Sequence, residues 1–386
     1  MISNKAIESF KSIETPFYYY DIDLLRETLS RYTSLINKYN YKAHYALKAN
    51  AEPNILKEIV NAGLGADCVS GNEVALAIKS GFSPDKVVYA GVGKSDKEIK
   101  TALKAGIFSF NCESIPEIAV INDIAASMGK VAKIALRVNP DIDAHTHKYI
   151  STGRRQDKFG ISPWMFDQVL ELIQNSKNVE LIGLHFHVGS QILEMPVFEL
   201  LCKRVKELQS WFNDKGVFIP NINLGGGLGV DYTNPNTNPI ADFENYFSII
   251  NKNLEVQSGQ NVHFEPGRAL VAQCGHLITR VLYVKLGKGM KFAILDAGMN
   301  DLIRPALYQA HHAIENLTST GRKLKYDVVG PICESSDRWG KSILLPQTSR
   351  GDLIAIHTAG AYGQVMGMRY NQKDLAKAYY SYDLVK

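Results

Sequence analysis

The chain lacks the features that mark membrane-spanning, secreted and nucleic-acid-binding proteins. It contains no stretch of about 18 uncharged apolar residues, so the sequence predicts no membrane-spanning helix. The first residues contain no apolar signal-like segment, and we expect a cytoplasmic protein. The formal net charge is only +4, with no dense run of lysine and arginine. Nucleic acid is therefore a poor candidate partner, and we expect a small-molecule ligand.

Cysteine is also scarce. The chain has five cysteines, an odd number, and none of them forms a C-x-x-C pair. They are Cys68, Cys112, Cys202, Cys274 and Cys333. Zinc sites and disulfide frameworks need regularly spaced cysteines, so we expect reduced thiols and no metal.

What the chain does have is a long series of short apolar runs. Its 386 residues, 45% of them hydrophobic, suffice for one large domain and a smaller one. Between residues 41 and 266, eight such runs are mostly separated by segments with helical spacing. They are Tyr41–Leu47, Ala66–Val69, Val87–Ala90, Ile107–Phe110, Ile134–Val138, Leu181–Val188, Ile222–Leu224 and Val262–Phe264. The pattern predicts an α/β fold, a closed (β/α)8 TIM-like barrel, although an open doubly wound sheet gives the same periodicity.

After about residue 270 the pattern changes to strands without long helices. The expected strands are Leu277–Lys285, Phe292–Asp296, Tyr326–Val329, Ile343–Leu345 and Leu353–His357. This pattern predicts a C-terminal antiparallel β domain over residues 271–386, after a barrel over residues 31–270. We expect the N-terminal segment, residues 1–30, to pack with that β domain through its aromatic run Pro16–Asp21.

Lys48 follows the first apolar run, within the block Tyr45–Asn50. A lysine behind a buried strand loses hydration, and with a lowered pKa it can attack a carbonyl and form a Schiff base. The alternative is a lysine whose ammonium reaches solvent at a strand end. Other polar residues and glycines also follow the predicted strands, where a barrel of this type has its active face. They are Ser70, Asn111, Arg137, Asn139, His187, Gly225–Gly229 and Glu265–Arg268.

Two of these segments indicate a phosphate site. Gly225–Gly229 follows the seventh run, and glycines let backbone N–H groups approach a phosphate closely. Glu265–Arg268 follows the eighth run, and barrels often bind phosphate in the loops after strands seven and eight. A lysine together with a phosphate site suggests pyridoxal phosphate, with Glu265 as the acid beside its ring nitrogen.

His185 and His187 alternate on one predicted strand and so share one face, a spacing that permits a metal pair. Only Glu265 is obviously placed to complete such a site. The neighbouring Gly189 and Ser190 fit a cofactor loop better. We therefore interpret His185 as a core histidine, and His187 and Ser190 as ring-stacking or phosphate-side groups.

Seven blocks, in order along almost the whole chain, resemble the pyridoxal-phosphate decarboxylases that have an alanine-racemase-like barrel. The blocks are Tyr45–Asn50, His187–Ser190, Gly225–Gly229, Glu265–Arg268, Arg304–Tyr308, Cys333–Asp337 and Ala359–Tyr362. The resemblance is strongest to the members that act on diaminopimelate. Related ornithine decarboxylases typically have an aspartate directly after the cysteine, where this chain has Glu334.

The resemblance implies a role for each of these residues. Lys48 would hold pyridoxal 5'-phosphate covalently, His187 would stack on its ring and Glu265 would pair with the ring nitrogen. The phosphate would be held by Ser190, Gly227, Gly229, Gly267, Arg268 and Tyr362. In the family's shared homodimer site, Cys333 and Glu334 would arrive from the other subunit, with Cys333 as the proton donor.

The resemblance also implies the reaction, which is decarboxylation of meso-2,6-diaminopimelate to L-lysine and CO2, the last step of lysine biosynthesis. The β domain would contribute to this site. The distal head of the substrate would be bound by Arg268, Arg304, Tyr308, Glu334 and Tyr362. Two alternatives stay open. One is a sibling decarboxylase that acts on another basic amino acid, a D-amino acid, or a polyamine or siderophore precursor. The other is a non-catalytic pyridoxal-phosphate-binding regulatory protein.

Overall fold

The computed structural model describes residues 2–142 and 158–384. Their contacts divide the chain into two compact units. The barrel unit comprises Leu29–Gly229 and Asp242–Gly267. The sheet unit comprises Met1–Thr28, Val230–Ala241 and Arg268–Lys386.

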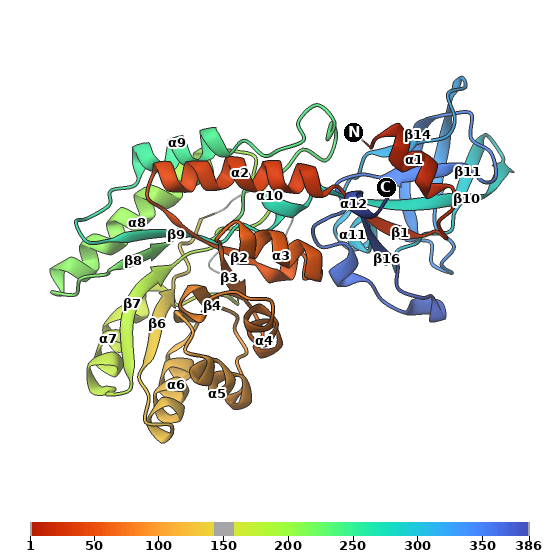
Figure 1. Ribbon diagram of the computed structural model, residues 1–386. Helices are drawn as coiled ribbons and strands as arrows, with labels where there is room; N and C mark the ends of the chain where they lie inside the picture. The colour runs from red at the N-terminus through yellow and green to blue at the C-terminus, as the bar shows by residue number, and fades with distance from the viewer. Residues whose placement is uncertain (1, 143–157, 385–386) are drawn as a thin grey trace. The chain divides into compact units, whose positions relative to one another are not determined.

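Eight strands in the barrel unit close into a parallel barrel in the order of the sequence (Figure 1). They are β2 (Lys42–Ala46), β3 (Gly65–Cys68), β4 (Val87–Tyr89), β5 (Ser109–Cys112), β6 (Ala132–Arg137), β7 (Val179–His185), β8 (Asn221–Asn223) and β9 (Asn261–Phe264). The first strand closes the barrel because β2 pairs in parallel with both β3 and β9. The predicted closed barrel is confirmed, and the open doubly wound sheet is excluded.

One helix precedes the first of these strands, and others connect successive strands. They are α2 (Ile22–Lys38), α3 (Pro53–Asn61), α4 (Gly71–Lys79), α5 (Asp96–Ala105), α6 (Ile115–Ser127), α7 (Phe166–Asn175), α8 (Pro196–Asp214) and α9 (Phe243–Asn253). In α3 the buried residues are Ile55, Leu56 and Ile59, a spacing that places them on one face. Ser70 and Ser114 begin α4 and α6 by accepting hydrogen bonds from backbone N–H groups in the first turn.

Eight further strands form the sheet unit. They are β1 (Phe17–Tyr20), β10 (Gly275–Gly287), β11 (Met290–Leu295), β12 (Ile314–Asn316), β13 (Lys323–Val329), β14 (Arg338–Pro346), β15 (Leu353–Ile356) and β16 (Lys377–Tyr380). The path is β12-β15-β10-β11-β13-β14, and β1 pairs with both β10 and β16. Most pairs are antiparallel, as predicted, but β11 with β13 and β1 with β16 are parallel. Alternation within one strand carries no information about the direction of its neighbour, so the sequence could not reveal these two pairs.

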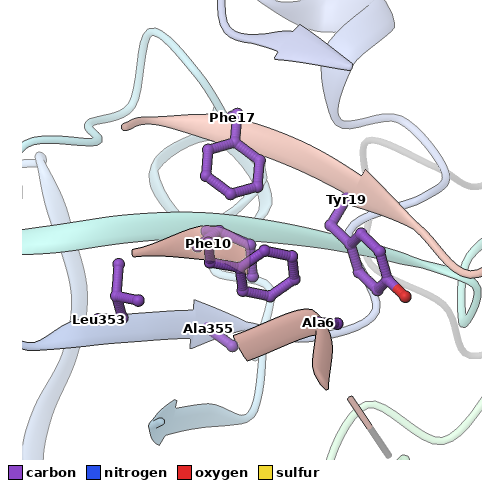
Figure 2. Packing of buried hydrophobic residues seen from close by; sticks show 7 residues of the cluster. Ala6, Phe10, Phe17, Tyr19, Leu353 and Ala355 are labelled. Atoms are coloured by element: carbon purple, nitrogen blue, oxygen red, sulfur yellow. The ribbon is translucent and has the colours of Figure 1, made fainter. Parts of the chain in front are cut away.

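An apolar cluster joins the N-terminal segment to this sheet (Figure 2). Phe10 of α1 (Asn4–Phe10) packs edge-on against Phe17 of β1, with ring centroids 5.4 Å apart. The cluster consists of Ala6, Phe10, Phe17, Tyr19, Ile278, Leu353 and Ala355. Three short helices complete the unit: α10 (Arg268–Val271), α11 (Arg304–Tyr308) and α12 (Ser381–Leu384). Both ends of the chain therefore belong to the same unit.

Across residues 2–142 and 158–384, no helix combines the length and the apolar character needed to cross a membrane.

Candidate active site

Lys48 lies in a short turn, Leu47–Ala49, directly after β2. Its Nζ is 3.6 Å from Oδ2 of Asp67, which belongs to β3. The lysine side chain is 37% exposed, whereas Asp67 is almost fully buried. Burial and the nearby charge of Glu265 raise the pKa of Asp67, while Lys48 opposes this shift. Lys48 is thus less buried than its position after an apolar run suggested, and sequence analysis did not identify its partner Asp67.

Glu265 follows β9 and accepts hydrogen bonds from three side chains. Asn223 Nδ2 is 2.7 Å away, Asn111 Nδ2 is 3.2 Å away and His185 Nε2 is 2.8 Å away. Burial opposes ionisation of Glu265, but His185, through its hydrogen bond and proximity, and Lys48 together hold the pKa of the carboxyl below its usual range. Glu265 is therefore a buried carboxylate whose negative charge is stabilised by donors of the barrel itself.

His187 lies just beyond β7 and is partly buried. The N–H of Gly226 donates to its Nδ1 at 3.3 Å. Burial, followed by the positive charges of Lys48 and Arg137, lowers the pKa of His187, so its ring is neutral. His185 Nε2 and His187 Nδ1 form hydrogen bonds with different residues, Glu265 and Gly226. Across the described residues, no group of three or more His, Cys, Asp and Glu side chains could hold a metal ion.

The four glycines of the loop Gly225–Gly229 leave little room for a Cβ atom. Gly227 has φ +115°, and a Cβ added to it would lie 2.9 Å from the carbonyl oxygen of Gly189. Within the described part of the chain, the N–H groups of Gly227, Leu228 and Gly267 donate no hydrogen bond. Unpaired backbone donors in such a loop are suited to an anion such as phosphate. Gly229 differs, because its N–H donates to Ile192 O at 2.9 Å.

Other residues near the strand ends have structural partners. Ser70 Oγ caps α4 by accepting from Glu73 N at 3.2 Å. Arg137 forms an ion pair with Glu113 at 2.6 Å, and both side chains are buried. Asn139 donates to Phe159 O at 3.3 Å. These contacts account for three of the polar residues that the sequence placed on the active face.

In the sheet unit, two buried arginines lie among aromatic rings. We call Arg268, Arg304, Tyr232, Tyr362 and His312 the arginine cluster. Arg268 Nη1 donates to the Tyr232 hydroxyl at 2.6 Å, and its guanidinium lies 4.8 Å from the ring centroid of Tyr362. The guanidinium of Arg304 lies 4.7 Å from the ring centroid of Tyr232.

The positive charge of Arg304 has no negatively charged partner in this cluster. Arg304 is 5% exposed and forms no ion pair with any described residue. Its Nη1 donates instead to Nε2 of His312 at 2.8 Å. Tyr308, at the end of α11, is partly buried. Sequence analysis did not identify Tyr232 or His312, because neither belongs to a motif. The cluster is well suited to bind an anion.

Cys333 and Glu334 are exposed in the loop between β13 and β14. The loop is held by Asp337, which accepts from the N–H groups of Ile332 and Met299 at 2.7 Å each. Cys333 N donates to the side chain of Asn371 at 3.2 Å. The Tyr370 hydroxyl donates to Glu334 at 2.8 Å. The thiol and carboxylate are therefore presented on the surface by an internally bonded loop.

Comparison with known proteins identifies related chains. Residues 23–272 match the family model of the pyridoxal-dependent decarboxylases, pyridoxal binding domain. A diaminopimelate decarboxylase of Bacteroides thetaiotaomicron is 54% identical over 380 residues, with 98% of each chain covered.

Solved structures give the same result. Diaminopimelate decarboxylase of Helicobacter pylori complexed with L-lysine matches with a TM-score of 0.89 and 40% identity, covering 97% of this chain and 93% of that one. The diaminopimelate decarboxylase of M. jannaschii in complex with L-lysine matches with a TM-score of 0.90 and 31% identity, covering 98% and 90%.

Proposed function

The chain belongs to the pyridoxal-dependent decarboxylase family, and from that premise we propose that it converts meso-2,6-diaminopimelate to L-lysine and CO2, the last step of lysine biosynthesis. The observation that carries the choice of substrate is the arginine cluster. Diaminopimelate has a second amino-acid head, whose carboxylate needs a positively charged site. Arg304 offers such a charge, since no carboxylate among the described residues neutralises it.

The barrel unit has the groups that pyridoxal phosphate requires. Lys48 would hold the cofactor covalently through Nζ, and the Glu265 carboxylate would pair with its ring nitrogen. The unpaired N–H groups of Gly227, Leu228 and Gly267 bind the phosphate, while Gly229 keeps the loop in shape through Ile192. When bound, the cofactor supplies an electron sink for the carbanion left by loss of CO2.

The remaining cofactor contacts are those that the family resemblance implies. His187, neutral and partly buried, would stack its ring on the cofactor ring. Ser190 lies three residues further along the same loop and binds the phosphate through its hydroxyl. Arg268 and Tyr362 contribute to the same anionic group.

The reaction also needs a proton donor for the carbon that has lost its carboxylate. Cys333 serves as that acid through its Sγ. Its exposure on an ordered loop supports a role in the site of a second subunit, so we propose a homodimer with shared active sites. Glu334, oriented by Tyr370, binds the distal ammonium, while Arg268, Arg304, Tyr308 and Tyr362 bind the distal carboxylate. All five cysteines are unpaired, which fits a cytoplasmic location.

A substrate panel tests this function. The purified protein, supplied with pyridoxal phosphate, should release CO2 and lysine from meso-diaminopimelate. The stereoisomers of diaminopimelate, ornithine, arginine and lysine serve as comparison substrates. Turnover of another basic amino acid with no lysine formed would identify a sibling decarboxylase instead. If the protein binds the cofactor but releases CO2 from none of these substrates, it is a regulatory protein.

Mixing two inactive variants tests the shared site. Lys48→Ala and Cys333→Ala should each be inactive alone. If Cys333 acts in the partner's site, random exchange of subunits should restore about one quarter of the wild-type activity, because half of the dimers would contain one intact site out of two. A mixture that stays as inactive as its parts would contradict the shared active site.

A further inference from the structure

His312 lies between a buried arginine and a backbone carbonyl, and these two neighbours fix its protonation. Arg304 Nη1 is 2.8 Å from its Nε2, and His357 O is 2.8 Å from its Nδ1. A guanidinium can only donate and a carbonyl can only accept. Nδ1 must therefore carry the hydrogen and Nε2 must offer its lone pair. His312 is a neutral imidazole with one defined tautomer.

The surroundings of His312 keep it neutral. The side chain is 2% exposed, and its ring lies edge-on to Tyr232 with centroids 5.1 Å apart. Burial, followed by the positive charge of Arg304, lowers the pKa of His312 to about 3. At neutral pH it therefore accepts from Arg304 without carrying a charge.

A neutral acceptor has a particular consequence for Arg304. Buried arginines are usually paired with carboxylates, which orient the guanidinium but also cancel its charge. His312 and the ring face of Tyr232 orient the guanidinium and leave its charge uncancelled. A buried charge without a carboxylate partner is costly unless an anionic ligand binds it.

We propose that His312 is a positioning residue for substrate specificity: it holds Arg304 in place through a neutral acceptor, so that the full positive charge of Arg304 is available to the distal carboxylate of the substrate. This inference rests on the proposed function. It makes the identity of residue 312, and not only that of Arg304, a determinant of affinity for dicarboxylate substrates.

Four variants of the holoenzyme test the proposal. His312→Glu places a carboxylate beside Arg304 and should raise KM for meso-diaminopimelate about 100-fold, with kcat changed only a few-fold. His312→Ala removes the acceptor and should raise KM about 10-fold. His312→Gln keeps an uncharged acceptor and should stay within about 3-fold of wild type. His311→Ala is the matched control, because His311 is the exposed neighbour.

The pH dependence separates charge cancellation from simple misfolding. In His312→Glu, the KM defect should shrink as the pH falls through the pKa of the new carboxylate, since protonation restores the charge of Arg304. A merely structural role would give a defect that does not change with pH. Equal cofactor absorbance in all variants shows that the barrel unit is intact.

Three outcomes would overturn the proposal. The first is a KM for His312→Glu equal to that of wild type. The second is a loss confined to kcat. The third is a His312→Gln variant as defective as His312→Ala. If His312→Glu does not fold, an unchanged KM in His312→Ala would also overturn the proposal. A wild-type enzyme that does not turn over meso-diaminopimelate overturns the proposed function itself, so the two failures are distinguishable.

Discussion

The barrel unit and the sheet unit each bury a charged side chain, and they treat it in opposite ways. Glu265 in the barrel unit receives hydrogen bonds from Asn111, Asn223 and His185. Arg304 in the sheet unit has a neutral histidine and an aromatic face as its neighbours. The barrel thus stabilises its own charge before any ligand binds, whereas the sheet unit leaves a charge to be neutralised by a ligand.

This difference predicts that the two units have separate functions, and mutations in each unit can test that prediction. Changes in the barrel unit should alter cofactor retention and kcat. Changes at Arg304 and His312 in the sheet unit should alter KM and leave the cofactor in place.

The largest effect is expected for Lys48→Ala. Without Nζ the chain cannot bind the cofactor covalently, and kcat should fall by a factor on the order of 10³ or more. The visible absorbance of the bound cofactor, measured after dialysis, should disappear. Lys42→Ala, at the exposed start of the same strand, is the control and should keep both properties. Retained absorbance and activity in Lys48→Ala would refute the assignment of the cofactor to the barrel unit.

Glu265→Gln should lower kcat by about 10²-fold, because a preorganised charge is lost from the site. The new amide also faces three donors that previously met a carboxylate, so some stability should be lost as well. Steady-state kinetics and cofactor absorbance measure the two effects. Glu180→Gln, an exposed change in β7, should leave kcat unaltered. An unchanged kcat in Glu265→Gln would show that the buried charge has no catalytic role.

Arg304→Ala should raise KM for meso-diaminopimelate by about 10- to 100-fold, since it removes a charge-assisted contact with the distal carboxylate. The cofactor spectrum should be that of wild type. The exposed Arg322→Ala in the same unit should behave as wild type in both assays. If Arg304→Ala instead released the cofactor, the proposed division between the two units would be wrong.

The smallest effect concerns stability at Asp67. Its pKa is raised above the usual 3.8, so the native state holds this proton more tightly than the unfolded state does. This contribution to stability is present at low pH and is lost as the pH rises from about 4 through the raised value. In cofactor-free protein, the difference in unfolding free energy between Asp67→Asn and wild type should shift in favour of the variant. The shift should be about 1 kcal/mol or more between pH 5 and pH 8. Thermal unfolding midpoints at pH 5 and at pH 8 measure this shift, and the exposed Asp85→Asn is the control. Parallel pH profiles for wild type and Asp67→Asn would contradict the raised pKa.

The sequence predicted the parts of the molecule that repeat or form motifs. Eight apolar runs indicated the barrel, and Lys48, Glu265 and the glycine loop stood out because each follows such a run. Asp67, Tyr232, His312 and Tyr370 were missed because each is a single residue whose role depends on a contact made only in three dimensions. Two short strands, β12 and β16, were also missed.

Because β1 pairs with β16, the β1 strand must wait during synthesis for a partner that is made much later. β1 is made among the first twenty residues, but its parallel neighbour spans Lys377–Tyr380. At synthesis rates of about 5 to 20 residues per second, the two are separated by roughly 20 to 70 s. The barrel unit, which ends at Gly267, can be fully synthesised while β1 still has an open edge. An exposed edge of four aromatic and apolar residues is a site for wrong pairing. Lys377–Tyr380 thus protects the edge of Phe17–Tyr20, a strand made about 360 residues earlier.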